Sequence, residues 1–195
     1  EFWHFFKPLL FNIDCIPFPA TWDGDKDYEE KESASLKALE QLLSEDPDSY
    51  AAIIVEPIQG EGGFIVPPKE FLVRLREICT EKDMLLIFDE VQTGFGRVGN
   101  HMWAHGPQGI VPDIVTLGKP IGNGHPMAAV VTIPEIAKAF ANGMEFFSSF
   151  GGNPVSAAVG MAVLDVLAQE SLQAKARVTG DHLKARFTAL AEKHS

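Results

Sequence analysis

Two neighbouring stretches of the chain share one layout, and this layout restricts the fold more than any other feature of the sequence. In each stretch an apolar run ends abruptly in a charged residue, and a glycine-rich loop follows. The run 84–88 leads to Asp89, and the run 113–117 leads to Lys119. Continuous apolar runs of this length are typical of buried parallel strands. Because an open α/β sheet places its chemistry at the carboxyl ends of its strands, we expect both charged groups at one edge of such a sheet.

The rest of the chain alternates between strand-like and helix-like patterns. Further strands are expected over 51–55 and 127–132, and 9–16 could add a short one. Apolar positions at helical spacing, together with capping residues and prolines, predict helices over about 33–44, 67–82, 134–140, 154–168 and 172–193. The first helix should begin at Ser33 or Ser35, because serine is a favourable N-cap. This order of elements predicts an α/β protein with three layers, in which helices cover both faces of a mostly parallel sheet.

Charge and hydropathy argue against two kinds of partner. The chain has a formal net charge of −11, and its lysines and arginines form no block, so we expect no nucleic-acid surface. The longest uncharged run, 146–164, approaches the length of a membrane span, but the loop residues 151–154 divide it. We therefore expect no membrane partner.

The cysteines indicate a reducing environment. Cys15 and Cys79 lie far apart in the sequence. A disulfide framework uses more cysteines, and a zinc site uses ligands at short spacing. We therefore expect two free thiols and a cytoplasmic location.

No metal site is expected. Residues 23–27 resemble a calcium loop, but the acid that should follow at the end of such a loop is missing. His101 and His105 have the spacing of a metal pair on a helix, but no third ligand accompanies them. A surface or packing role is the simpler interpretation of both features.

Taken alone, Asp89 and Lys119 admit two interpretations. The interval between them allows one crossover and a return strand, which would bring both to the same edge of the sheet. A strand-end lysine beside an acid can form a structural ion pair. Alternatively, the lysine can form a Schiff base with pyridoxal phosphate while the acid holds the protonated pyridine nitrogen, and this chemistry needs both groups. Spacing alone leaves both interpretations open.

Four motifs, in order, resemble those of the class III aminotransferases, which are fold-type-I pyridoxal-phosphate enzymes. They stand at 56–63, 88–99, 117–126 and 150–156. The resemblance covers about residues 50 to 190. It implies that residues 1–168 are the second half of the large cofactor domain, and that residues 169–195 begin the helical linker to a small C-terminal domain.

The resemblance assigns cofactor roles to the residues at the matching positions. Lys119 would form the Schiff base, and Asp89 would pair with the pyridine nitrogen. Val91 would pack on the face of the ring, and Gln92 would lie near its hydroxyl group. Ser149 stands where the family usually has threonine, and it would bind the cofactor phosphate across the interface of a homodimer.

The resemblance also places residues on the substrate side of the cofactor. Glu56 and Glu61 would border the substrate, with Glu61 the usual partner of a switching arginine. Arg97 more often braces its loop than binds substrate. The implied substrates are an amino-group donor and a 2-oxo acid acceptor.

Three functions are compatible with these motifs. The first is amino transfer through Lys119. The second is a phospho-lyase reaction, because the motifs at 96–101, 111–126 and 143–147 look closest to the branch that contains the ethanolamine-phosphate and phosphohydroxylysine phospho-lyases. The third is a non-catalytic domain that serves dimerisation, because the resemblance implies that the family's upstream phosphate loop lies outside this sequence.

Overall fold

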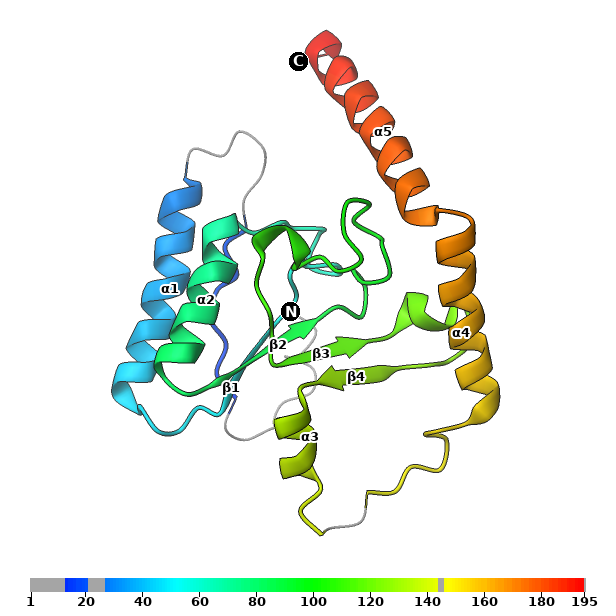
Figure 1. Ribbon diagram of the computed structural model, residues 1–195. Helices are drawn as coiled ribbons and strands as arrows, with labels where there is room; N and C mark the ends of the chain where they lie inside the picture. Colours follow the sequence, from blue (N-terminus) through cyan, green and yellow to red (C-terminus); the bar gives the residue numbers. More distant parts are fainter. Residues whose placement is uncertain (1–12, 21–26, 144–145, 195) are drawn as a thin grey trace.

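The computed structural model describes residues 13–20, 27–143 and 146–194 of the chain (Figure 1). At its centre lies a four-stranded sheet in the order β1-β2-β3-β4. The strands are β1 (Ala52–Val55), β2 (Leu85–Asp89), β3 (Ile114–Leu117) and β4 (Ala129–Thr132). β1, β2 and β3 are parallel, and β4 pairs antiparallel with β3. The predicted α/β fold with a mostly parallel sheet is confirmed.

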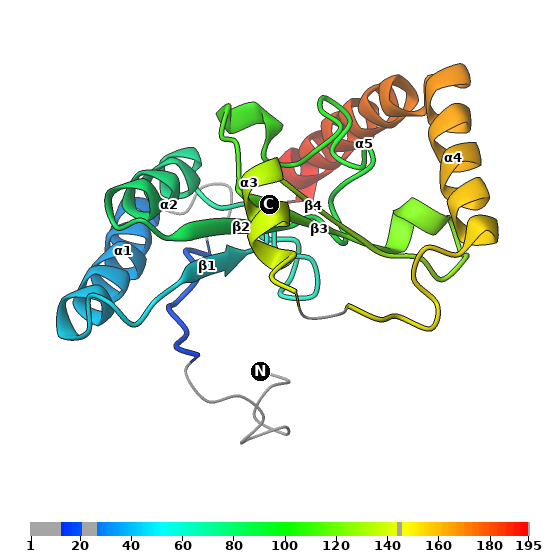
Figure 2. The ribbon, with the colours of Figure 1, turned by 60° about the horizontal axis from the view of Figure 1, so that its bottom comes forward.

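Helices flank this sheet on opposite sides of the molecule (Figures 1 and 2). They are α1 (Tyr28–Glu45), α2 (Lys69–Glu81), α3 (Pro134–Phe140), α4 (Pro154–Gln169) and α5 (Leu172–His194), with short 3₁₀ helices η2 (Gly106–Gln108) and η3 (Lys119–Gly122). α1 and α2 lie side by side next to β1 and β2, whereas α4 and α5 lie beyond the end of β3. Every helix and strand that the sequence predicts beyond residue 27 is present.

The first helix begins earlier than the sequence pattern suggests. α1 starts at Tyr28, and Glu29 and Glu30 in its first turn suit the positive end of the helix dipole. Ser35 is fully buried inside the helix, and its hydroxyl has no hydrogen-bond partner among the described residues. The expectation that Ser33 or Ser35 caps this helix is therefore wrong, because Ser35 packs against the core.

Two predictions fall partly outside the described residues. A strand over 9–16 was expected, but residues 13–16 form none, and 9–12 are not described. Most of the segment that resembles a calcium loop, 23–26, is likewise not described.

The main core lies between the sheet and the helices α1 and α2. Leu86 and Phe88 of β2 are fully buried, whereas Leu85 and Ile87 are half-buried. This alternation shows that one face of β2 is turned towards the helices. Apolar side chains of both helices complete the cluster: Leu36, Leu39, Leu43, Phe71, Leu72, Leu75, Ile78 and Cys79. The packing fixes the course of β2 and therefore the position of the acid at its end.

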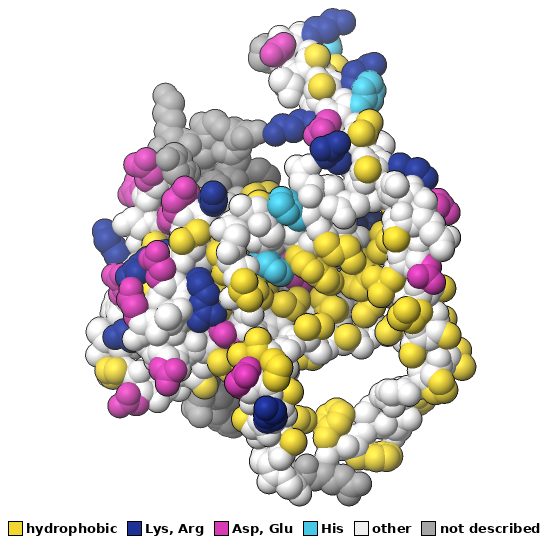
Figure 3. All heavy atoms as spheres, in the orientation of Figure 1, with side chains coloured by type: hydrophobic (Ala, Val, Ile, Leu, Met, Phe, Trp, Pro, Cys, Tyr) yellow, Lys and Arg dark blue, Asp and Glu magenta, His cyan; other side chains and the backbone are white. Residues whose placement is uncertain are grey.

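A smaller apolar cluster holds the segment that follows β3. Phe95, Leu117 and Ile121 are buried in it, and Val163 and Leu167 of α4 pack against them. Figure 3 shows the hydrophobic side chains that gather between the sheet and α4. Because this cluster contains a residue of η3, it fixes the turn that carries the predicted lysine.

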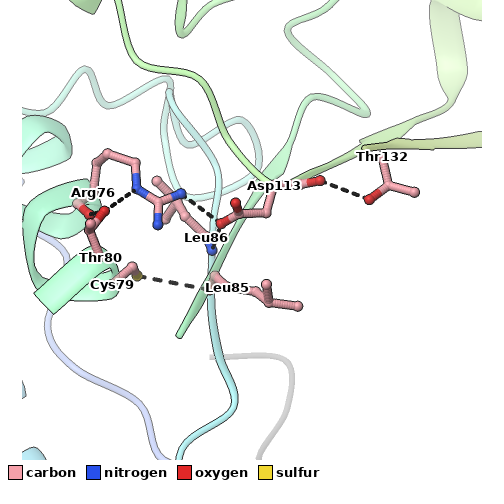
Figure 4. Close-up of polar contacts among 7 residues, drawn as sticks. All are labelled: Arg76, Cys79, Thr80, Leu85, Leu86, Asp113 and Thr132. Carbon is pink, nitrogen blue, oxygen red and sulfur yellow. Dashed lines mark hydrogen bonds and ion pairs between the residues drawn. The ribbon is translucent and has the colours of Figure 1, made fainter. Parts of the chain in front are cut away.

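A polar network ties the amino end of β3 to its surroundings (Figure 4). The Arg76 guanidinium lies 2.6 Å from Asp113 Oδ2, and the Leu86 amide donates to the same oxygen at 2.7 Å. The Asp113 amide donates to the Leu86 carbonyl at 2.9 Å, and the Thr132 hydroxyl donates to the Asp113 carbonyl at 2.9 Å. Asp113 therefore joins α2, β2 and β4 at one point, at the end of β3 that lies away from Lys119.

The predicted free thiols are confirmed. Cys15 is exposed and Cys79 is buried, and neither forms a disulfide. Burial raises the pKa of Cys79 to about 11, so this thiol stays neutral and packs as an apolar group.

Within the described ranges, no single helix is long and apolar enough to span a membrane. Only α4 and α5 taken together reach the length and apolar composition of a membrane span, and a 60° bend separates them.

Candidate active site

The carboxyl ends of β2 and β3 lie side by side. Asp89 pairs with Thr116 in the register of the two strands, and the Glu90 amide donates to the Thr116 carbonyl at 3.0 Å. Lys119 begins η3, just beyond the end of β3. Both predicted groups therefore lie at the same edge of the sheet, which is where α/β sheets place their sites.

The Lys119 amine is directed at Gln92. Its Nζ donates a hydrogen bond to Gln92 Oε1 at 2.5 Å, and the lysine side chain is exposed. In the described part of the chain Lys119 forms no ion pair with Asp89. The structural ion pair is therefore not supported, and no carboxylate of the described residues neutralises the amine.

The backbone of Lys119 adopts a conformation that few residues other than glycine adopt. Its φ is +39°, in the left-handed region, where a side chain costs about 1–2 kcal/mol. The Ile121 amide donates to the Gly118 carbonyl at 3.1 Å, and the Ile121 side chain is buried. Packing of this turn therefore holds Lys119 in a strained conformation at the end of the strand.

Two glycines make room for the side chains around the lysine. A Cβ on Gly118 would lie 3.1 Å from Val91 Cγ1, and a Cβ on Gly60 would lie 2.5 Å from Gln92 Cδ. Val91 therefore packs directly against the residue before Lys119, and Gln92 lies between Gly60 and the lysine amine. The structure brings these predicted site residues together.

Asp89 presents one carboxylate oxygen that is already bound and one that is open. Oδ1 accepts a hydrogen bond from the Val91 amide at 2.9 Å, which orients the side chain. No hydrogen bond to Oδ2 is found among the described residues. The second oxygen can therefore accept a hydrogen bond from a cationic group at the edge of the sheet.

The two predicted substrate-side acids lie on the loop that follows β1. Glu56 Oε2 accepts a hydrogen bond from the Gly60 amide at 2.9 Å, so this acid orders the loop beside Gln92. A β-bridge between Gln59 and Ile65 closes the same loop. Glu61 is exposed at its tip.

Ser149 is exposed on the segment that joins α3 to α4 (Figure 1). No hydrogen bond in the described part of the chain joins it to Lys119 or Asp89. The amides of Val155 and Ser156 at the start of α4 donate to the Asn153 side chain, at 2.8 and 3.2 Å. The N-cap side chain therefore already uses these two amides.

The residue after β2 forms a buried contact that the sequence analysis missed. Glu90 is 1% exposed. Its Oε2 accepts from the Thr93 hydroxyl at 2.6 Å and the Ala104 amide at 3.1 Å, and its Oε1 accepts from the His105 amide at 3.1 Å and from His105 Nδ1 at 2.7 Å. Burial alone would raise the pKa of Glu90, but these hydrogen bonds hold its pKa below the ordinary value. The charged carboxylate therefore joins the two ends of the loop between β2 and η2.

His105 consequently has a packing role. Its ring stacks on Phe88 with the ring centroids 5.3 Å apart, and its Nδ1 binds Glu90. No group of three potential metal ligands occurs within the described residues. The sequence signal for this contact is a second acid directly after the strand-end acid, but its partners stand 15 residues further on and only the fold brings them close.

A cavity of about 660 Å³ lies between the lysine turn and the helices α4 and α5. Its walls include residues of 95–97 and 120–125, with Arg97 among them. Asp89 and Lys119 do not line it. The cavity therefore does not include the predicted lysine and its acid, which lie at the strand ends.

Comparison with known proteins identifies the family. The family described as aminotransferase class-III matches residues 1–195, the whole chain. The chain belongs to the class-III aminotransferases. Class-III aminotransferases use pyridoxal phosphate.

Individual class-III relatives are considerably longer than this chain. The alanine–glyoxylate aminotransferase 2-like protein of Drosophila melanogaster is 44% identical over 180 residues, which cover 88% of this chain and 36% of the relative. The mitochondrial alanine–glyoxylate aminotransferase 2 of Homo sapiens is 46% identical over 142 residues, which cover 73% of this chain and 28% of the relative. Among solved structures, the lysine aminotransferase of M. tuberculosis in the internal aldimine form is 33% identical, with a TM-score of 0.81 over 92% of this chain and 41% of its own.

The residues of this class-III chain fit one end of the cofactor. Among the described residues, Lys119 offers an amine that no carboxylate neutralises, Asp89 offers an oxygen without a hydrogen-bond partner, and Gln92 holds the amine in place. Gly118 lacks the Cβ that would crowd Val91. The amine can react with the aldehyde of the cofactor, and the carboxylate oxygen can bind its protonated pyridine nitrogen. The individual roles of these residues stay predictions.

Proposed function

We propose that the complete protein transfers an amino group from an amine or amino acid to a 2-oxo acid, with pyridoxal phosphate as cofactor. The observation that carries this proposal is the arrangement at the strand ends. The Lys119 amine is bound by the Gln92 amide rather than by Asp89, and Asp89 keeps an oxygen open. Because the chain spans only 28% to 41% of the relatives described above, the activity is proposed for the full-length protein.

The chain's own residues have distinct tasks in this reaction. When bound, pyridoxal phosphate supplies an aldehyde that an amine can attack and a ring that takes up the electron pair left when a substrate carbon loses its proton. Asp89 Oδ2 would accept a hydrogen bond from the ring nitrogen and favour its protonated form. Gln92 positions the amine of Lys119, whose Nζ would take up the proton that the substrate carbon loses and return it later in the reaction. Val91 would cover the ring and keep water away.

The phospho-lyase reaction is the second candidate, and the motif resemblance to the phospho-lyase branch supports it. Both reactions begin with the removal of a proton by Lys119, but the lyase then expels a phosphate group from the adjacent carbon. We expect the full-length protein, loaded with cofactor, to convert a 2-oxo acid into an amino acid when an amino donor is supplied. Incubation with phosphoethanolamine should release no inorganic phosphate. Phosphate release without amino transfer would reverse the assignment.

A homodimer is part of the proposal. Ser149 is exposed, and the side chains of Phe146, Phe147 and Phe150 around it are 74–86% exposed. A second copy that covers these rings would bring Ser149 to the cofactor phosphate of that copy. The full-length protein should therefore sediment at twice its monomer mass, and a monomer with full activity would contradict the arrangement.

A reducing compartment, most simply the cytoplasm, is proposed for the protein. The two free thiols support it. The human relative is named mitochondrial, and fractionation of cells that produce the full-length protein distinguishes the two locations.

A further inference from the structure

One buried hydroxyl lies beside the site without a partner. Thr116 Oγ1 is inaccessible to solvent and forms no hydrogen bond within the described residues. Buried hydroxyl groups are nearly always hydrogen-bonded, because desolvation without a partner is unfavourable. An exception directly beside Asp89 therefore calls for a functional explanation.

Among the neighbours of Thr116 in the sheet, one side chain can accept a hydrogen bond from its hydroxyl. Asp89 of β2 and Val130 of β4 are its partners across the sheet, and Ile114 and Gly118 are its neighbours on the same face along the chain. Among these four, only Asp89 has a polar side chain. Adjacent strands lie about 4.8 Å apart, and side chains in register leave the sheet on the same face, so rotation about one bond can bring hydroxyl and carboxylate together.

Asp89 has the capacity to accept this hydrogen bond. Its Oδ1 is bound to the Val91 amide, whereas Oδ2 has no partner among the described residues. A carboxylate oxygen can accept two hydrogen bonds, so Oδ2 can serve the hydroxyl and a ring nitrogen together. The backbone hydrogen bond from Glu90 to the Thr116 carbonyl, at 3.0 Å, fixes the two residues opposite each other.

We propose that Thr116 is a positioning residue that holds Asp89 for the cofactor. Its hydroxyl donates to the Asp89 carboxylate when the protonated pyridine ring is bound, and this hydrogen bond keeps the carboxylate charged and directed at the ring nitrogen. The inference rests on the proposed function, because it needs a cationic ring at Asp89. It also explains why the hydroxyl is tolerated without a partner in the cofactor-free chain.

The inference predicts that Thr116→Val weakens cofactor binding without lowering the stability of the cofactor-free protein. In the full-length protein, Thr116→Val should weaken the binding of pyridoxal phosphate about tenfold, because a hydrogen bond to a charged acceptor is lost. The melting temperature of the cofactor-free variant should stay the same or rise, because an unpaired buried hydroxyl is removed. Thr116→Ser, which keeps the hydroxyl, should bind the cofactor within about twofold of the natural protein.

Two further variants separate this role from a general effect on the sheet. Thr132→Val removes a threonine hydroxyl that binds the Asp113 carbonyl at the far end of β3, so it should leave cofactor binding unchanged. In an Asp89→Asn background, Thr116→Val should weaken binding by no more than about twofold, because the charged acceptor is absent.

Each outcome has one meaning. Unchanged cofactor affinity in Thr116→Val, or an equal loss in the Asp89→Asn background, would overturn this inference while the proposed function stands. A lower melting temperature of the cofactor-free Thr116→Val protein would also overturn it, because the hydroxyl would then serve the fold. If the natural full-length protein binds no pyridoxal phosphate, the proposed function fails and this inference fails with it.

Discussion

Replacing Lys119 by alanine in the full-length protein should lower the rate of amino transfer by at least about a thousandfold. The substitution removes the amine that reacts with the cofactor aldehyde and the group that moves the substrate proton. It also leaves Gln92 without the donor it binds at 2.5 Å. The absorbance band near the visible that forms on addition of pyridoxal phosphate should disappear, and a titration followed by spectroscopy measures this directly.

A second lysine provides the control for this result. Lys138 is exposed on α3, away from the strand ends, so Lys138→Ala should keep both the band and the activity. The melting temperature of Lys119→Ala without cofactor should match that of the natural protein, because alanine inherits the same backbone conformation. A band that persists in Lys119→Ala would show that another amine reacts with the cofactor.

Replacing Glu90 by glutamine should destabilise the full-length protein by about 3 kcal/mol. All the groups that surround the Glu90 carboxylate donate hydrogen bonds, two to each oxygen. In either orientation a glutamine would turn its NH₂ group towards a backbone amide, of Ala104 or of His105, and this buried amide would lose its acceptor. The loss should appear as a lower melting temperature, close to that of Glu90→Ala.

The same carboxylate should make the stability of the protein depend on pH. The folded-state pKa of Glu90 lies below its unfolded value, so its contribution is present above the unfolded pKa and is lost as the pH falls through the folded one. Melting temperatures measured between about pH 6 and pH 3 should therefore fall less steeply in Glu90→Gln than in the natural protein. Glu135→Gln, at an exposed acid of α3, should leave the acid side of the profile unchanged. Parallel profiles for the natural protein and Glu90→Gln would contradict the role of Glu90.

The positions of the helices and strands follow from local signals in the sequence. Asn153 and Pro154 mark the start of α4, and the structure confirms this cap through two hydrogen bonds to the Asn153 side chain. The apolar runs before Asp89 and Lys119 become adjacent parallel strands, so the edge that carries both groups was also predictable. The helix cap depends on residues next to each other in the sequence, and the shared edge follows from the general rule that parallel strands place their carboxyl ends together.

The contacts that shape the site depend on residues distant in the chain. Lys119 contacts Gln92, and Glu90 contacts His105, only because the loop after β2 folds back on itself. The start of α1 was misjudged for a related reason, since the burial of Ser35 is decided by packing against the core. Neither periodicity nor capping preferences contain this information, and the motif resemblance supplies roles without contacts.

The backbone conformation at Lys119 is unfavourable for stability, although the reaction needs the lysine side chain. With a φ of +39°, the position would suit glycine better than any residue with a side chain. Selection for stability alone would therefore favour the loss of the amine, and an engineer who searches for stabilising substitutions by backbone conformation would choose this position early. The resulting protein should tolerate heat better than its parent and have no reactive lysine, so thermostabilised variants of this protein should be designed with position 119 held fixed.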